Sequence, residues 1–292
     1  MAAIIHRPNL SEAWLASMEH LLLVGGKEIN LITVIDSPSF EVLAVRQRLD
    51  EFISSRRSNQ TWPVSTVANT IFPASLYLPR LGEGAQDHLY RVHKEGDRIR
   101  RRFNANKSGT YFDRLTAWPS DKGECNQLER TIRRLGKAAN RNPLSSAYEI
   151  AVSTPEDDEY QAGDLRIYKP GIDNRTRGFP CLSHISLTSV KGVLHMTATY
   201  RNQHFISRAY GNYVGLSRLL GFLAHEAELN PGELVCMATH ADAEIRQRRG
   251  FGKRAVQALV DSCREIFSDQ QAAAVERPVL PALQLTHSLR TQ

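Results

Sequence analysis

The chain has 292 residues, of which 41% are hydrophobic, and a formal net charge of +6 at pH 7. This length can bury a large core and suits one large domain or two modest ones. No apolar run approaches a membrane span, and "HLLLVGG" (20–26) is too short and too late for a secretory signal. We therefore expect a cytoplasmic protein with no membrane partner.

The basic excess gathers in short clusters, among them "RIRRRF" (98–103), "RTR" (175–177) and "RQRRGFGKR" (246–254). A basic balance favours phosphate-bearing partners. These clusters lack the aromatic platforms or recognition helix of a DNA- or RNA-binding module, so we expect no nucleic-acid partner. The cysteines show no CxxC or Cys/His spacing, which predicts free thiols and no metal site. They are Cys125, Cys181, Cys236 and Cys263.

The first half of the chain is dominated by helical periodicity. Ser11 is the expected cap of the first helix. A buried strand is predicted over 30–37, and 69–79, with two prolines, has no clear assignment. The predicted helices are 10–24, 39–57, 86–102 and 126–140.

Alternating strand patterns follow Pro143. Lys191-Gly192 predicts a hairpin turn, and Pro231-Gly232 is expected to end a long helix over 214–230. The whole pattern predicts a single α+β domain over 1–292, with its strands concentrated in the second half. The predicted strands are 147–154, 183–190, 193–205 and 232–245, followed by a helix over 253–268.

Residues 178–245, beginning "FPCLSHISL", resemble the catalytic core of the thymidylate synthase family. That family has a Pro-Cys before a strand, a hairpin, an Arg on the next strand and an Asn leading into a long helix. Here Arg201 follows Cys181 by 20 residues (201 − 181) and Asn212 follows it by 31 (212 − 181). Upstream, "YFDRLTAW" with "NQLERTIRRL", and "TWPVST", resemble further family segments. Residues 1–55 and 253–292 diverge from the family.

The resemblance implies a thymidylate-synthase-like α+β fold, a large mixed sheet flanked by helices, one face of which forms a homodimer interface. It implies a C5 methyl- or hydroxymethyltransferase of nucleotide metabolism acting on a pyrimidine nucleotide, with methylenetetrahydrofolate as the one-carbon donor. Cys181 would add to C6 of the ring. Arg201 would bind the substrate phosphate and lower the pKa of the thiol, and Asn212 would read the base edge. Trp118 would lie on the folate side.

Several family positions carry other residues here. Ser146 and Ala147 stand where the family has paired phosphate-binding arginines. His204 replaces an aspartate that contacts folate. Asp242 and Glu244 replace a ribose-binding histidine and tyrosine. The stretch "VANTIFPASLYLPR", where the family has its relay glutamate, contains no acid.

Other residues of the chain are candidates for the missing roles. His204 is a candidate proton carrier. Asp242 and Glu244 are candidates for hydrogen bonds to ribose hydroxyls or to a cationic group. Replacement phosphate ligands could come from two pairs of arginines, of which the first, on an N-terminal loop, is preferred. The pairs are Arg56 with Arg57, and Arg175 with Arg177.

Three interpretations stay open. The chain is a divergent enzyme, a nucleotide-binding sensor for regulation or phage defence that has lost the reaction, or a protein that shares only the fold. If these three residues do not form a catalytic site, each has an ordinary structural role. Cys181 would be a small buried hydrophobic residue, Arg201 a charged residue at a strand edge and Asn212 a helix N-cap.

Overall fold

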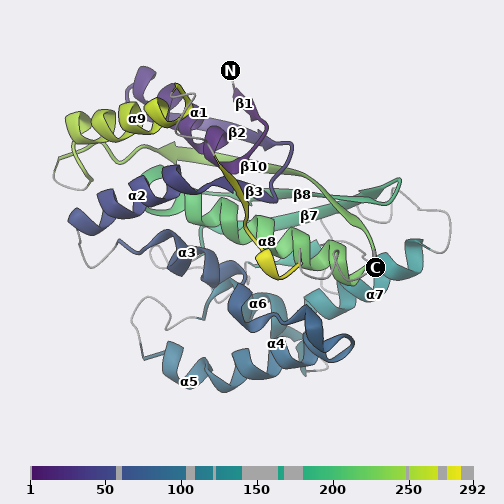
Figure 1. Ribbon diagram of the computed structural model, residues 1–292. Helices are drawn as coiled ribbons and strands as arrows, with labels where there is room; N and C mark the ends of the chain where they lie inside the picture. The colour runs from purple at the N-terminus through teal and green to yellow at the C-terminus, as the bar shows by residue number, and fades with distance from the viewer. Residues whose placement is uncertain are drawn as a thin grey trace.

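A computed structural model gives a mixed α/β architecture in which a large mixed sheet is flanked by helices (Figure 1). No helix among the described residues is long and apolar enough to cross a membrane. The structure describes residues 2–56, 61–102, 109–120, 123–139, 164–167, 180–247, 250–268 and 275–283. The α-helices are α1 (Leu10–Leu23), α2 (Leu43–Ser55), α3 (Val64–Ile71), α4 (Gly84–Glu95), α5 (Asp97–Arg100), α6 (Tyr111–Thr116), α7 (Gln127–Ala139), α8 (Tyr210–Glu226) and α9 (Lys253–Ser268).

The main sheet runs in the order β1-β2-β10-β8-β7-β6, with the short strand β9 also pairing with β10. Strands β1 and β2 are parallel, as are β8 and β10, and the other neighbours on the path are antiparallel. Two small two-stranded sheets, β3 with β11 and β4 with β5, stand apart. The strands are β1 (Ala3–Arg7), β2 (Lys27–Ile35), β3 (Phe40–Val42), β4 (Trp118–Ser120), β5 (Gly123–Cys125), β6 (Asp164–Arg166), β7 (Leu182–Val190), β8 (Val193–Tyr200), β9 (Gln203–His204), β10 (Asn230–Asp242) and β11 (Glu276–Pro278).

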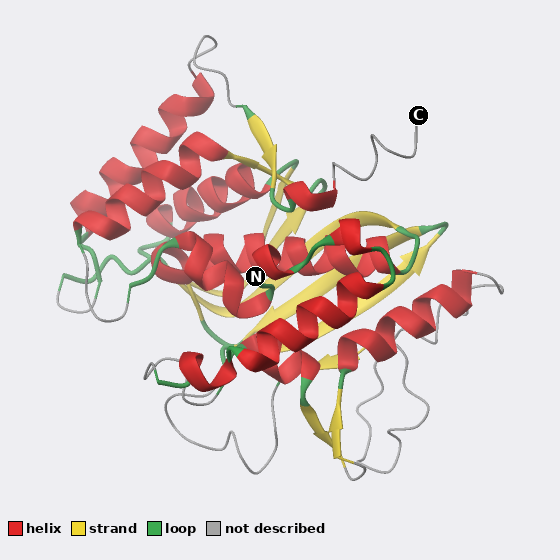
Figure 2. Cartoon of the chain, turned by 60° about the horizontal axis from the view of Figure 1, so that its bottom comes forward, coloured by secondary structure: helices red, strands yellow, loops and turns green. Residues whose placement is uncertain are grey.

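The two faces of the sheet differ in burial. Figure 2 shows helices in front of the strands, and α1 and α8 pack directly on β2 and β10. Alternate residues face this helical layer and are buried, namely Leu31, Ile35, Met196, Ala198, Leu234 and Cys236. The residues between them stay partly or fully exposed, namely Ile32, Val34, Thr197, Val235 and Met237. The second face is therefore not covered by any described helix.

Helix α8 is the centre of the core, because almost every residue from Tyr210 to Ala224 is buried. The sheet lies on one side of α8 and α3 on the other (Figure 1). Gly211 and Gly215 allow α3 to approach closely. A Cβ on Gly215 would lie 2.8 Å from the carbonyl oxygen of Ala68. A helix enclosed in this way needs no polar face, which explains its weakly amphipathic sequence.

Most of the predicted elements are confirmed. Helices α1, α7 and α9 and strands β2, β7, β8 and β10 lie within a few residues of their predicted positions. Lys191 and Gly192 both have positive φ, as a tight hairpin turn requires. The predicted strand at 147–154 lies outside the described residues. The predicted helix over 86–102 is α4 followed by the short α5.

Four details differ from the prediction. The cap of α1 is Asn9, whose side chain accepts the Glu12 N–H, while Ser11 is buried and bonds Tyr210. Helix α8 ends at Glu226, and Pro231-Gly232 lie within β10, because a left-handed turn at Glu228 has already reversed the chain. The start of the predicted helix 39–57 is strand β3. Strand β1 was missed, since as an edge strand it lacks a buried alternation.

Candidate functional site

Cys181 stands immediately before β7, and its backbone is held from two directions. The N–H of Cys181 and that of Leu182 both donate to the Tyr111 hydroxyl, at 3.2 and 3.3 Å. The carbonyl oxygen of Cys181 accepts the N–H of Arg201 at 2.9 Å. The residue is neither fully buried nor exposed. The backbone of Cys181 is thus held between the start of β7 and the residue that follows β8.

Tyr111 is a site residue that the sequence analysis did not single out. It is the first residue of α6, and a capping box places it there. The Asp113 carboxylate accepts the Thr110 N–H at 2.6 Å, and the Thr110 hydroxyl accepts the Asp113 N–H. Burial, and next the charge of Cys181, raise the pKa of Tyr111 to about 12. Tyr111 therefore stays a neutral phenol that accepts two N–H groups and keeps one proton to donate.

The charge environment of the thiol differs from the prediction. Burial raises the pKa of Cys181, and this effect outweighs the opposite effect of two guanidinium groups, Arg208 first and Arg201 second. The predicted lowering by arginine is therefore wrong for the net shift, although Arg201 acts in the predicted direction. Desolvation disfavours a thiolate more than these two cations favour it. The sequence analysis also missed Arg208.

Arg208 belongs to η6, a π-helical turn (Phe205–Ala209) that leads directly into α8. Burial lowers the pKa of its guanidinium, while the charges of Glu244, Tyr111 and Cys181 raise it. Arginine stays protonated under such shifts. The side chain is therefore a permanent cation within the field of the thiol. A single sequence gives no sign that Arg208 lies near Cys181, because the position of Arg208 depends on the π-helical turn.

Glu244 holds the start of η6. One carboxylate oxygen accepts the N–H groups of Ile206 and Ser207, at 3.0 and 2.8 Å, and the other accepts the Ser207 hydroxyl at 2.8 Å. Glu244 itself has φ of 55°, a conformation that few L-residues adopt. Its N–H donates to Asp242 at 2.8 Å. Both oxygens that were expected to meet ribose hydroxyls are already bonded to the protein.

Asp242 and His204 lie on neighbouring strands at the same end of the sheet. Asp242 also pairs with Lys27 at 3.1 Å. Burial raises the pKa of Asp242, but the Glu244 N–H and Lys27 lower it more, so the net shift is downward. The His204 ring lies 3.2 Å from the Asn202 amide and 4.0 Å from Glu244. No contact between His204 and Cys181 is found.

The structure places the other predicted site residues less closely together. Asn212 is nearly buried in the first turn of α8. Arg56 is exposed at the end of α2, with its guanidinium 4.2 Å above the Phe52 ring. Trp118 is half-buried and begins the β4–β5 hairpin. The remaining predicted positions lie outside the described residues, namely Arg57, Ser146, Ala147, Arg175 and Arg177.

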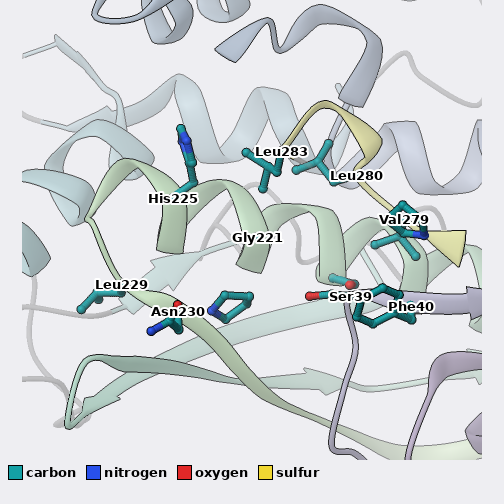
Figure 3. A pocket seen from close by; sticks show the side chains of 12 residues that line it. Ser39, Phe40, Gly221, His225, Leu229, Asn230, Val279, Leu280 and Leu283 are labelled. Atoms are coloured by element: carbon teal, nitrogen blue, oxygen red, sulfur yellow. The ribbon is translucent and has the colours of Figure 1, made fainter. Parts of the chain in front are cut away.

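A cavity of about 610 Å³ lies elsewhere, against the C-terminal half of α8 (Figure 3). Leu280 and Leu283, from the segment that ends in the 3₁₀ turn η7 (Pro281–Leu283), approach Gly221 of α8, and His225 and Asn230 lie at its edge. None of the predicted site residues lines it. The cavity and the Cys181 cluster are therefore separate features of the fold.

Comparison with known proteins agrees with the resemblance at a coarse level. No family model matches the chain. The chain is 26% identical over 132 residues to "Putative thymidylate synthase" proteins of Methanosarcina barkeri and of Methanococcoides burtonii. Each match covers 45% of this chain, which spans about half (51%) of each relative. The chain is thus distantly similar to proteins that carry the thymidylate synthase name.

Proposed function

We propose that the chain is a divergent thymidylate-synthase-like enzyme that adds Cys181 to C6 of a pyrimidine nucleotide and activates C5 for one-carbon transfer. The observation that carries the proposal is the setting of Cys181. Its backbone is bonded to Tyr111 and Arg201, and two guanidinium groups favour its thiolate. The distant similarity to the two archaeal proteins supports the same reading.

In this proposal each residue has a stated chemical role. The Cys181 thiolate forms the S–C6 bond, and the electron pair of the C5–C6 double bond moves to the enolate, which leaves C5 nucleophilic. A bound phosphate lies between Arg201 and Arg208, so Arg208 supplies charge that the family's paired arginines would supply. The neutral Tyr111 hydroxyl donates its remaining proton into the site. Asn212 reads the base edge by donating and accepting hydrogen bonds.

Because burial raises the pKa of the Cys181 thiol, we expect this thiol to be mostly protonated in the free protein near neutral pH. Water excluded by a bound nucleotide disfavours the thiolate further, whereas the charges of Arg208 and Arg201 favour it. We therefore expect Cys181 of the free protein to react slowly with alkylating agents near neutral pH.

For the one-carbon donor we propose only that it is a folate. When bound, methylenetetrahydrofolate would supply the carbon that C5 attacks. Of the residues assigned to its side, Trp118 begins a separate hairpin and His204 sits beside Asn202 and Glu244. No observation brings these two residues together around one ligand, so the proposed steps end at activation of C5.

We also propose a homodimer that pairs through the uncovered face of the main sheet. Ile32, Val34, Val235 and Met237 present apolar surface there, beside the exposed Thr197. Contiguous apolar patches of this kind mark interaction surfaces. Sedimentation of the purified chain tests the proposal, and a monomer at micromolar concentration contradicts it.

The decisive experiment is exchange of the C5 hydrogen of uridine and cytidine nucleotides, ribo and deoxy, in heavy water, followed by NMR. Reversible addition of Cys181 lets C5 take up a deuteron before the thiolate leaves, with no folate present. We expect exchange in the wild type, loss of exchange in C181A, and unchanged exchange in C125A, which removes another half-buried thiol. Exchange that persists in C181A contradicts the proposed nucleophile.

A second candidate is a nucleotide sensor, and the raised pKa of Cys181 favours it. A thiol that stays protonated is a poor nucleophile but does not prevent binding. Nucleotide binding that is equal in wild type and C181A, without C5 exchange in either, would establish the sensor instead of the enzyme. Absence of both binding and exchange would leave only the shared fold.

A further inference from the structure

Three potential metal ligands meet on the sheet face that no described helix covers, at the end of the sheet away from Cys181. His6 lies on β1, Asp36 directly follows β2 and Glu233 lies on β10. These strands are neighbours in the order β1-β2-β10. His6 pairs with Val34, and Leu234 pairs with Ile35, so the three side chains fall on one face in adjacent rows.

The ligand atoms of this cluster are already close. One oxygen or nitrogen from each of the three side chains lies within 4.8 Å of the others. The His6 Nε2 and Asp36 Oδ1 atoms are 2.5 Å apart. Ligands of a tetrahedral ion at roughly 2.0–2.2 Å are separated by about 3.3 Å. His6 and Asp36 are more than half exposed, so small side-chain rotations reach that spacing.

The charges of the cluster favour a cation. Asp36 and Glu233 are two carboxylates held near one another, and like charges at this distance repel. Among the described residues, His6 is the only side chain that bonds Asp36, and none bonds the Glu233 carboxylate. His195 of β8 accepts the N–H of Glu233 at 3.2 Å, which fixes the backbone that carries this carboxylate.

We propose that His6, Asp36 and Glu233 bind one Zn²⁺ ion per chain. An imidazole with two carboxylates suits Zn²⁺, whereas Mg²⁺ prefers an all-oxygen octahedral set. The ion ties the edge strand β1 to β2 and β10 and stabilises the fold. The site does not depend on the proposed reaction at Cys181. The sequence analysis expected no metal because it considered only local Cys and His spacing, while these ligands are 30 and 197 residues apart (36 − 6; 233 − 36).

The test is titration of the full-length chain with ZnCl₂ by isothermal calorimetry after chelator treatment. We expect one ion per chain and a rise in melting temperature with Zn²⁺, since a ligand of the native state stabilises it. H6A, D36N and E233Q should each weaken binding by about tenfold or more. MgCl₂ should not compete.

The matched control is H20A. His20 also pairs with a carboxylate, Glu28 at 3.0 Å, but has no third potential ligand among the described residues. H20A should bind Zn²⁺ like the wild type. Equal binding by H6A and wild type overturns the proposal and points to the cysteine thiols. One ion per two chains overturns the single-chain site in favour of a site between copies. Because His6 is exposed, metal-free H6A should melt close to the metal-free wild type, which shows that it folds.

Discussion

Polar groups around Cys181 and around Glu244 are arranged in opposite ways. At Cys181 the backbone is bonded from both sides, and the guanidinium groups of Arg201 and Arg208 act on a thiol that makes no hydrogen bond of its own among the described residues. At Glu244 both side-chain oxygens are used to bond the protein. The arrangement at Cys181 is that of a candidate reactive group, whereas the hydrogen bonds at Glu244 stabilise the π-helical turn η6.

The difference teaches that a residue at a family's ligand position need not be a ligand. Glu244 replaces a side chain expected to contact sugar, yet its oxygens hold η6. Holding η6 also determines where Arg208 lies. The residue at the family's sugar-binding position therefore helps to place Arg208, which we propose as a ligand of the substrate phosphate. The following predictions test this contrast.

The largest stability effect is expected for E244A. The change leaves the N–H groups of Ile206 and Ser207 without their acceptor, which should lower the free energy of unfolding by about 3 kcal/mol. E228A is the matched control, since Glu228 has the same left-handed φ but is exposed. Urea denaturation measures both. An E244A protein as stable as E228A would contradict the scaffold role.

Y111F should have the next largest effect. It removes the oxygen that accepts the N–H groups of Cys181 and Leu182, so the free energy of unfolding should fall by about 2 kcal/mol. The control is Y200F, which deletes a buried hydroxyl that has no partner among the described residues and should cost little. If both variants unfold at the same urea concentration, Tyr111 does not hold Cys181.

R208Q should slow alkylation of Cys181 several-fold near neutral pH. Arg208 lowers the pKa of the Cys181 thiol and so opposes the effect of burial. Without this cation the pKa of the thiol rises further. R201Q should shift the pH profile of alkylation in the same direction but less, because Arg208 has the larger effect. Iodoacetamide kinetics followed by mass spectrometry measures both profiles. An unshifted R208Q profile would remove Arg208 from the site.

D242N should have the smallest effect, about 0.5 kcal/mol at neutral pH, because the pair with Lys27 is partly exposed. The folded-state pKa of Asp242 is lowered, so its contribution is present above the unfolded value and lost as pH falls through the folded value. The stabilities of wild type and D242N should begin to converge below about pH 4 and become equal once pH falls below the lowered folded-state value. In K27Q the D242N change should cost less than in the wild type, because only the bond from the Glu244 N–H is then weakened.

Sequence reasoning reached much of the fold because local rules governed it. The alternation in β7 and β8, with a Lys-Gly turn between them, needs only neighbouring residues to be recognised. It failed where distant contacts decided the outcome. Ser11 has the right chemistry for an N-cap, but it is buried against Tyr210, so Asn9 caps α1 instead. The end of α8 was misplaced because a turn at Glu228 preceded the expected proline.

By itself, the sequence determined the α+β class, the main helices and strands, and the spacing of Cys181, Arg201 and Asn212, since these depend on side-chain periodicity and order along the chain. The tertiary structure alone decided which charges act on the thiol. Tyr111 reaches the start of β7 from α6, and Arg208 acts on the thiol from η6, so both lie near Cys181 only in the folded chain. It also decided that burial outweighs those cations, because desolvation depends on every neighbour in space.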